Sequence, residues 1–434
     1  MKLHAISLGC QMSAADNAEM AAPLRARGFS NAEGLDDADA VLISTCTVRQ
    51  HAEDRALSLI GTLREWKAQR PERLLIVAGC AAERLKDWLQ KRFDYIDLVV
   101  GAKSIEQFPQ LIEEALKGRF ELAAEDDMAL APQAAVSSYV TIMRGCNYSC
   151  SYCIVPAVRG RELYRPTEDI LRDIRIKVEG GAREIMLLGQ TVNSYRQTHE
   201  GRPVDFPDLL RLVDKVDGLK RVRFMSPHPH YLSERMIAAM AECPTVCEAL
   251  HIPVQSGSDR LLKMMRRNYT RDEFLGRISR LRSAVKGVVI STDIIVGFPT
   301  EREEEFIASL SLLKEMGASS AYCFKYSPRE STESAAWPDD VPQTQKEERL
   351  KRLNGLVDEL SQEALRRQIG GTVEVLTDED NFGRTRSGFK VKVSSAAGAG
   401  RLVNVAITGA TRLTLLGNLV PEHMQQTAIA GGTL

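Results

Sequence analysis

Three cysteines close together in the chain are the residues best suited to carry out chemistry. Cys146, Cys150 and Cys153 follow an apolar run at 139–143, so a strand can deliver the first and a tight loop can wrap the other two around one object. Thiolates select soft metals and iron–sulfur clusters. A structural zinc site would need a fourth ligand nearby, usually a second cysteine or histidine pair, and none follows. Three ligands on a four-iron cluster leave one iron open to bind a substrate. The alternatives are a zinc loop or three unrelated thiols.

The spacing of these cysteines resembles the signature of the radical S-adenosylmethionine (SAM) superfamily. The resemblance implies that the open iron of a [4Fe-4S] cluster binds the amino and carboxylate groups of SAM. One electron from the cluster then cleaves SAM to methionine and a 5′-deoxyadenosyl radical, which removes hydrogen from an unactivated C–H bond. It therefore assigns Cys146, Cys150 and Cys153 to both metal binding and catalysis.

Three further cysteines each follow an apolar run in the N-terminal region. The runs at 3–8, 40–45 and 74–79 lead to Cys10, Cys46 and Cys80, with helical stretches between them. This order predicts a β-α-β-α-β arrangement with a parallel sheet. Parallel crossovers return each strand in the same direction, so the three thiols should meet at one sheet edge, where ligands bind. We predict a second metal site there. The alternative is that each cysteine is a small buried residue at a strand end.

From residue 139 the chain alternates between strands and helices. The predicted strands are 139–143, 184–188, 221–225, 249–254, 287–296 and 320–326. Six units without an obvious seventh or eighth predict a partial (β/α)6 barrel, in which sites lie at the carboxyl ends of the strands. Polar side chains at these ends suit the ribose and methionine groups of SAM, although each alone fits a turn or a helix cap. With Tyr152 of the cysteine loop, the candidate SAM-binding residues are Gln190, Asn193, Gln255, Ser256 and Asp293.

The C-terminal region changes character. Short strand-like runs at 372–376, 389–393, 402–407 and 413–420 follow one another without helices, which predicts a small antiparallel β-barrel. Barrels of this kind often hold nucleic acid with basic loops. The candidate RNA-binding residues are Arg384 and Arg386 on this barrel, and Arg159 and Arg161 beside the cysteine loop. A structural lid with solvated arginines is the alternative.

Composition limits the class of protein. The chain has 434 residues, too many for one ordinary core, with 44% hydrophobic and 26% charged residues. No apolar run approaches the roughly 20 residues that a membrane span needs. The net charge is −1, so nucleic-acid binding must use local basic patches. Nine cysteines without a signal-peptide layout favour a reducing cytoplasm over a disulfide framework.

Taken together, the motifs resemble the radical-SAM methylthiotransferase family over about residues 2–425. The residues that carry the resemblance are Gly9–Met12, Thr45–Arg49, Tyr148–Pro156, Val158–Glu162 and Val254–Asp259. Within the family they are most similar to the tRNA branch that makes 2-methylthio-isopentenyladenosine (the MiaB type). The resemblance implies three domains: an N-terminal methylthiotransferase domain at 1–118, a radical-SAM core at 132–364 and a TRAM RNA-binding barrel at 367–428.

The resemblance also implies the reaction. One [4Fe-4S] cluster on Cys146, Cys150 and Cys153 cleaves SAM, and a second on Cys10, Cys46 and Cys80 carries or supplies sulfur, which another SAM methylates. The methylthio group is inserted at C2 of isopentenyladenosine beside the anticodon.

The implied partners are tRNA, bound at its anticodon stem-loop, and an electron donor such as flavodoxin; the sulfur donor is not indicated, and no membrane is involved.

Three alternative functions remain. The chain could act on threonylcarbamoyl-adenosine in tRNA, on an aspartate of a ribosomal protein, or serve as a non-catalytic iron–sulfur RNA-binding module.

Overall fold

The computed structural model describes residues 1–120 and 135–421, which form two compact units. The first unit combines the N-terminal residues with two later segments, Met143–Tyr148 and Ile154–Leu163. The second unit contains Ser149–Cys153 and the chain from Tyr164 onward, together with the strand that precedes the cysteine loop. The cysteine loop therefore contributes residues to both units. The boundary expected between the domains at 1–118 and 132–364 lies mostly outside the described residues.

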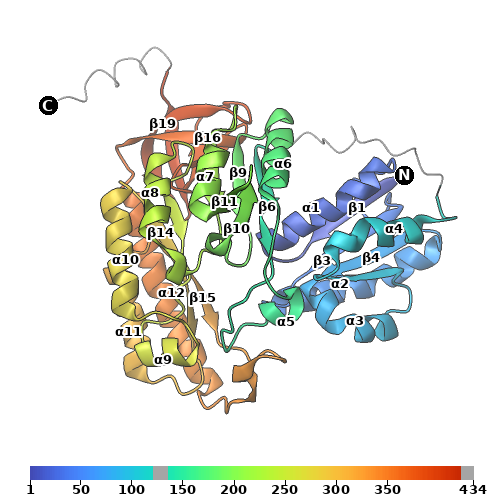
Figure 1. Ribbon diagram of the computed structural model, residues 1–434, viewed down its shortest axis with the longest axis horizontal. Coiled ribbons are helices and arrows are strands. Elements are labelled where there is room, and N and C mark those ends of the chain that lie inside the picture. Colours follow the sequence, from blue (N-terminus) through green and yellow to red (C-terminus); the bar gives the residue numbers. More distant parts are fainter. Residues whose placement is uncertain (121–134, 422–434) are drawn as a thin grey trace. The chain divides into compact units, whose positions relative to one another are not determined.

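The first unit is built on a five-stranded parallel sheet in the order β2-β1-β3-β4-β5 (Figure 1). The strands are β1 (Lys2–Ser7), β2 (Ser30–Asn31), β3 (Ala40–Thr45), β4 (Leu74–Gly79) and β5 (Leu98–Gly101). The helices are α1 (Gln11–Ala26), α2 (Gln50–Gln69), α3 (Cys80–Arg92), α4 (Phe108–Leu116) and α5 (Val155–Arg159). The predicted parallel sheet is confirmed, and β1, β3 and β4, the strands that lead to the three cysteines, are direct neighbours.

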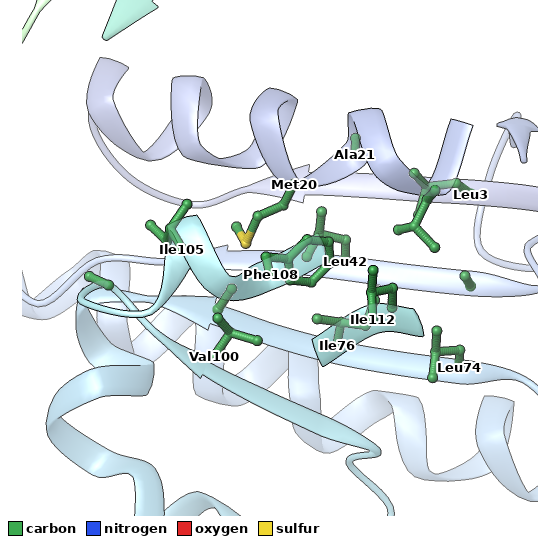
Figure 2. Close-up of a cluster of buried hydrophobic side chains, with 14 of the residues drawn as sticks. Leu3, Met20, Ala21, Leu42, Leu74, Ile76, Val100, Ile105, Phe108 and Ile112 are labelled. Atoms are coloured by element: carbon green, nitrogen blue, oxygen red, sulfur yellow. The ribbon is translucent and has the colours of Figure 1, made fainter. Parts of the chain in front are cut away.

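Apolar side chains cover both faces of this sheet. On one face Leu42, Ile76 and Val100 pack against Met20 of α1 and Phe108 of α4, as Figure 2 shows. On the other face alternate residues of β3 and β4 pack against α2 and α3. Every residue of β3 and β4 is buried, as expected for central strands of a parallel sheet covered on both sides. The rigid core fixes where the strand ends lie.

The short helix α5 belongs to the first of these two core clusters. Val158 of α5, and Ile154, the residue just before α5, are buried in the same cluster as Cys80. The segment that follows the cysteine loop is therefore held by apolar contacts beside one of the N-terminal cysteines.

The second unit contains six parallel strands, in agreement with the predicted partial barrel. They form two three-stranded sheets, ordered β12-β9-β6 and β13-β14-β15, and a parallel bridge between Val222 and Val246 lies between the two sheets. The strands are β6 (Ser137–Thr141), β9 (Glu184–Leu188), β12 (Arg221–Phe224), β13 (Ala249–His251), β14 (Val289–Val296) and β15 (Ser320–Lys325). The helices between and after them are α6 (Thr167–Glu179), α7 (Phe206–Asp214), α8 (Glu234–Glu242), α9 (Asp259–Met264), α10 (Arg271–Ala284), α11 (Glu303–Glu315) and α12 (Gln343–Arg366).

A hairpin that the sequence did not predict lies between β9 and α7. Its strands are β10 (Arg196–His199) and β11 (Arg202–Asp205), paired antiparallel. Both strands are mostly polar and partly exposed, so they lack the alternating apolar pattern that marks a half-buried strand.

The C-terminal strands close into a barrel in the order β16-β17-β18-β20-β19. They are β16 (Thr372–Glu379), β17 (Phe382–Thr385), β18 (Lys390–Val393), β19 (Leu402–Ala410) and β20 (Thr414–Leu419). The expected antiparallel pairing holds except between β18 and β20, which are parallel. A closed ring of five strands requires such an exception, because directions cannot alternate around an odd number.

Buried arginines attach this barrel to the other strands of the second unit. Arg221 of β12 is fully buried and donates to the carbonyl of Arg384 at 2.7 Å and to the Glu374 carboxylate at 2.9 Å. Arg223 donates to the carbonyl of Thr385 at 2.7 Å. In the opposite direction, Arg386 of the barrel donates to the Glu248 carboxylate at 2.8 Å. The barrel is thus fixed by charge-assisted hydrogen bonds.

Within the described ranges, no helix combines the length and the apolar character that a membrane span requires.

Candidate active site

The three N-terminal cysteines lie just beyond the carboxyl ends of neighbouring strands. Cys10 is the residue before α1, Cys46 follows β3, and Cys80 is the first residue of α3. Two of the thiols thus stand at helix N-termini, where backbone N–H groups and the helix dipole favour negative charge. Gly79 has φ +101°, and a Cβ there would lie 2.5 Å from the carbonyl of Thr45. Glycine is therefore required for the turn that delivers Cys80.

The thiols influence one another electrostatically. A hydrogen bond from the Cys46 thiol, aided by the backbone N–H groups of Ser13 and Met12, lowers the pKa of Cys10 to about 6. The same bond and burial raise the pKa of Cys46, and burial raises that of Cys80. Cys10 is exposed, while Cys46 and Cys80 are buried. The thiols therefore lie within electrostatic reach of one another, and the thiolate form that binds metal is already favoured at Cys10.

A buried group of charges adjoins these cysteines. Asp16 of α1 is fully buried and accepts from two arginines, Arg144 on one oxygen and Arg159 on the other, the latter at 2.7 Å. Arg144 also donates to Glu19 at 2.6 Å. Arg159 donates through Nε to the Cys80 sulfur at 3.2 Å. The charges of the four side chains sum to zero. Asp16, Arg144 and Arg159 are buried, and Glu19, whose side chain is 48% exposed, balances the second arginine from the surface.

The chemistry of this donor set is compatible with an iron–sulfur cluster. Among the residues that the structure describes, no group of three or more His, Cys, Asp or Glu side chains is arranged to hold one metal ion. Ligands of a four-iron cluster each bind a different iron and so stand further apart than ligands of one ion. Three thiols at adjacent strand ends, with an arginine donating to one sulfur, match the thiolate ligation and sulfur hydrogen bonding of such clusters.

The first cysteine of the loop is held by the first unit. The Cys146 amide donates to the carbonyl of Gly160 at 3.1 Å, and the Tyr148 amide donates to the Cys146 sulfur at 3.4 Å. Gly145 has φ +73°, and a Cβ there would lie 2.1 Å from the carbonyl of Arg161. The close approach of these two backbone segments, with the Gly160 carbonyl, orients the thiol.

The other two loop cysteines are held by the second unit. Arg267 directs Nη1 to the Cys150 sulfur at 3.5 Å, and the Cys153 amide donates to the carbonyl of Cys150 at 3.1 Å. Ser151 hydrogen-bonds the carbonyls of Met264 and Met265. The loop is therefore held at Cys150 and at the residues that follow it. Tyr152 packs against the cluster of Leu261, Met265, Ile295, Phe298 and Tyr326, and burial raises its pKa.

The predicted SAM-binding residues divide into two groups. Gln190 and Asp293 each have a buried side-chain oxygen, Oε1 and Oδ1 respectively, without a hydrogen-bond partner among the described residues. His251 Nε2 lies 3.4 Å from this Asp293 oxygen, without hydrogen-bond geometry. Asn193, by contrast, is occupied on both sides: it donates to the carbonyl of His228 and accepts from the His228 amide. Its amide orders a loop.

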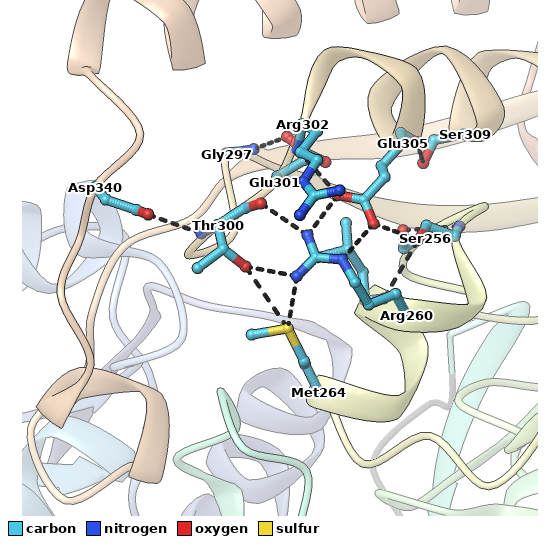
Figure 3. Close-up of polar contacts among 12 residues, drawn as sticks. Ser256, Arg260, Met264, Gly297, Thr300, Glu301, Arg302, Glu305, Ser309 and Asp340 are labelled. Atoms are coloured by element: carbon cyan, nitrogen blue, oxygen red, sulfur yellow. Dashed lines mark hydrogen bonds and ion pairs between the residues drawn. The ribbon is translucent and has the colours of Figure 1, made fainter.

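Gln255 and Ser256 form the turn that follows β13. Gln255 has φ +78° and exchanges backbone hydrogen bonds with β14. The hydroxyl of Ser256 is buried and accepts from the Ser258 amide at 3.2 Å. Figure 3 shows the support of this turn: Arg260 of α9 bonds Glu305 of α11 through two donors, at 2.8 and 2.6 Å. The turn is rigid, and the Ser256 hydroxyl already has a structural role.

The predicted RNA-binding arginines also divide. Arg161 is exposed, and Arg384 keeps 43% of its side chain exposed, with Asp378 3.6 Å away. Arg159 is only 6% exposed, and its guanidinium faces Asp16 and Cys80, so burial leaves it no access to RNA phosphate. Arg386 is directed at Glu248 and the carbonyls of Pro244 and Val246. The RNA prediction does not fit the position of Arg159, and Arg386 serves to attach the barrel.

Sequence reasoning missed the buried charges. Asp16 has no motif around it, and its partners lie more than 120 positions away in the chain. The one available signal was its place on α1, six residues after Cys10, on the face that carries the buried Met20 and Leu24. A carboxylate on an apolar helix face predicts a buried partner.

Comparison with known proteins agrees with the fold. The model of the radical SAM superfamily matches residues 140–313, and the model described as uncharacterized protein family UPF0004 matches residues 2–101. Among solved structures, the radical SAM methyltransferase TsrM from Kitasatospora setae aligns with a TM-score of 0.56 at 13% identity, over 77% of each chain. This likeness supports the fold alone.

Relatives with curated names match nearly the whole chain. A protein of Caldicellulosiruptor saccharolyticus is 39% identical over 96% of this chain and 92% of its own length. Proteins of Sorangium cellulosum and Syntrophobacter fumaroxidans are 40% and 39% identical, over 95% and 97% of this chain and 89% and 96% of their own lengths. All three are named tRNA-2-methylthio-N(6)-dimethylallyladenosine synthase. The chain is a radical SAM enzyme and belongs to the family of the tRNA-2-methylthio-N(6)-dimethylallyladenosine synthases.

Proposed function

We propose that this protein inserts a methylthio group at C2 of isopentenyladenosine, that is N6-dimethylallyladenosine, beside the anticodon of tRNA. The observation that carries the proposal is the similarity to synthases of that name over nearly their full length. The two three-cysteine sets of one chain support it, because the reaction needs a radical and a source of sulfur.

In this proposal the two cysteine sets have separate roles. Cys146, Cys150 and Cys153 hold the cluster that binds SAM, and Cys10, Cys46 and Cys80 hold a second one. When bound, the first supplies the electron that cleaves SAM to the 5′-deoxyadenosyl radical, and the second supplies or carries the sulfur. The Gly79 turn and the two helix N-termini support this role for the N-terminal set, because they present preformed donors to anionic sulfur.

Side chains of the second unit are suited to bind SAM. The unpartnered oxygens of Gln190 and Asp293 are acceptors, and the ammonium and ribose hydroxyl groups of SAM are donors. A buried acceptor without a partner is unfavourable until a donor arrives. We assign these two residues to SAM. Tyr152, Asn193, Gln255 and Ser256 shape the surroundings, Asn193 and Ser256 through hydrogen bonds within the protein.

The tRNA is bound by local positive charge. With a net charge of −1, the chain has no global attraction for RNA, so we assign phosphate contacts to exposed arginines such as Arg161 and Arg384. The target adenine must leave its stack to reach a buried radical, and an anticodon loop offers a base that is already unpaired. We also propose an electron donor such as flavodoxin and a reducing compartment, the cytoplasm, because the clusters must be reduced to act.

Three functional regions accompany these roles: the sulfur-carrying region at 1–118, the SAM-cleaving region at 132–364 and the RNA-binding barrel at 367–428. The family-model matches at 2–101 and 140–313 support the first two. The closed barrel between Thr372 and Leu419 supports the third.

The test is mass spectrometry of tRNA nucleosides. Anaerobically reconstituted protein is incubated with SAM, a reductant and tRNA containing either isopentenyladenosine or threonylcarbamoyl-adenosine. We expect a methylthio product only from the first. A product from the second, or from a ribosomal protein offered instead of tRNA, would contradict the substrate assignment. The variant with Cys10, Cys46 and Cys80 replaced by alanine is the control: it should still release 5′-deoxyadenosine but make no methylthio product.

A further inference from the structure

Arg159 is a buried cation with an unused donor group. Its Nε donates to the Cys80 sulfur at 3.2 Å and its Nη2 to Asp16 Oδ2 at 2.7 Å. Its Nη1 is buried and has no hydrogen-bond partner among the described residues. The side chain is 4% exposed, so water does not readily take the place of the missing acceptor.

The position of this guanidinium is fixed before any ligand binds. The Asp16 carboxylate bridges Arg159 to Arg144, and Val158, the neighbour of Arg159, is buried in the core cluster that contains Cys80. A guanidinium has five N–H donors in a rigid plane. With Nε and Nη2 engaged, Nη1 cannot turn to another acceptor without breaking those two bonds.

The chemistry around Nη1 identifies the missing acceptor. The Nε of the same guanidinium donates to the sulfur of Cys80, one of the three thiols that follow neighbouring strands. Anionic sulfur is therefore the acceptor that we expect for Nη1 at this site. Carboxylate and phosphate fit less well, because the Asp16 carboxylate already occupies the other end of the guanidinium.

We propose that Arg159 is a positioning residue of the N-terminal three-cysteine site, with Nε bonding the Cys80 thiolate and Nη1 donating to a further sulfur atom of the group that the three cysteines hold. The inference rests on the proposed second cluster and deepens it. A cationic donor stabilises added negative charge, so Arg159 favours the reduced cluster and the binding of an extra anionic sulfur ligand, such as a thiolate, at the site.

The experiment isolates the second cluster in the full-length chain. Cys146, Cys150 and Cys153 are replaced by alanine, so that only the N-terminal site can hold iron. In this background R159Q and R159K are compared with the parent by electron paramagnetic resonance, in a redox titration and in a titration with methanethiolate. We expect R159Q to lower the reduction potential and to weaken methanethiolate binding about tenfold or more, since a charge-assisted hydrogen bond is lost.

R159K tests geometry apart from charge. Lysine keeps the positive charge, but a single ammonium cannot bridge Cys80, Asp16 and a third acceptor at guanidinium spacing. We expect it to retain iron and to bind methanethiolate several-fold more weakly than the parent. R64Q is the matched control: it removes an arginine of the same unit whose side chain is 59% exposed, and it should change neither quantity.

The outcomes distinguish failure of the proposed second cluster from failure of the proposed role of Arg159. If the parent with only the N-terminal cysteines binds no iron, the second cluster itself is refuted. If it binds iron but R159Q and R159K match it in potential and methanethiolate affinity, the role of Arg159 is refuted and the cluster stands. If R159Q fails to retain iron, R159K decides: parental affinity in R159K would overturn the proposal.

Discussion

The Asp16 carboxylate should be worth more to stability than any surface charge of the first unit. D16N keeps the shape of the side chain but places an amide N–H against one of the two buried guanidinium groups. Breaking a buried ion pair costs about 3–5 kcal/mol, because a charge is left without compensation. Arg144 retains Glu19, whereas Arg159 loses the carboxylate with which it is paired. We therefore expect a loss near the lower end of this range, about 3 kcal/mol.

Hydrogen exchange measures this loss where it occurs. A chain with two units need not unfold in one step, so a global melting temperature is a poor measure. The amides of Val158 and Gly160 donate within α5, at 3.2 and 3.1 Å, and report opening of that segment. In metal-free protein, D16N should speed their exchange by about a hundredfold or more, as a loss of about 3 kcal/mol requires.

The control is D94N, which breaks an exposed pair with Arg64 at 3.3 Å and should leave the exchange of these amides unchanged. The reasoning would be refuted by D16N protein in which Val158 and Gly160 exchange as slowly as in the parent. That result would mean that the apolar contacts of α5 hold the segment without the ion pair.

Three further predictions concern iron, pH and RNA. Anaerobic reconstitution should load about eight irons per chain, and alanine at Cys146, Cys150 and Cys153 should leave about four; full iron content in that variant, measured by colorimetric iron assay, would contradict the assignment of the loop. Burial raises the pKa of Glu301 to about 7, above the unfolded value, so its contribution is fully present below about pH 4.5 and is lost as pH rises through 7. E301Q should remove that part of the pH dependence, about 3 kcal/mol, in unfolding measured from pH 5 to 8; an unchanged pH profile would argue against the shift. R384Q should weaken binding of an anticodon stem-loop and reduce the salt slope by about one, with SAM cleavage unchanged, as fluorescence anisotropy and product assays can check; an unaltered slope would leave the barrel as a lid.

The elements that the sequence predicted correctly are those with strong local patterns. Short, mostly apolar runs such as Ala40–Thr45 and Leu74–Gly79 favour central strands, and helices between them favour a parallel sheet. The cysteines at their ends therefore had to share one edge. The same logic located the strands of the second unit.

The features that the sequence did not predict depend on partners far away in the chain. Arg159 was predicted to bind RNA because it lies beside the cysteine loop in the sequence, and only the fold reveals that Asp16 and Cys80 surround it. Arg386 was likewise given to RNA, but in the structure it bonds Glu248. The parallel pairing of β18 with β20 follows from closure of an odd-numbered ring, and no local signal encodes it.

The interleaving of the two units has a consequence for biosynthesis. Ile154 and Val158 complete the apolar core around Cys80. They are synthesised long after β4, the strand that precedes Cys80. On the ribosome the N-terminal sheet must therefore emerge with an open apolar patch beside its cysteines and with Asp16 still without its two arginines. At typical synthesis rates of about 5–20 residues per second, this nascent state lasts for seconds. The proposed site at the N-terminal cysteines is therefore complete only after translation beyond residue 159, and a fragment ending at residue 120 would expose the same patch.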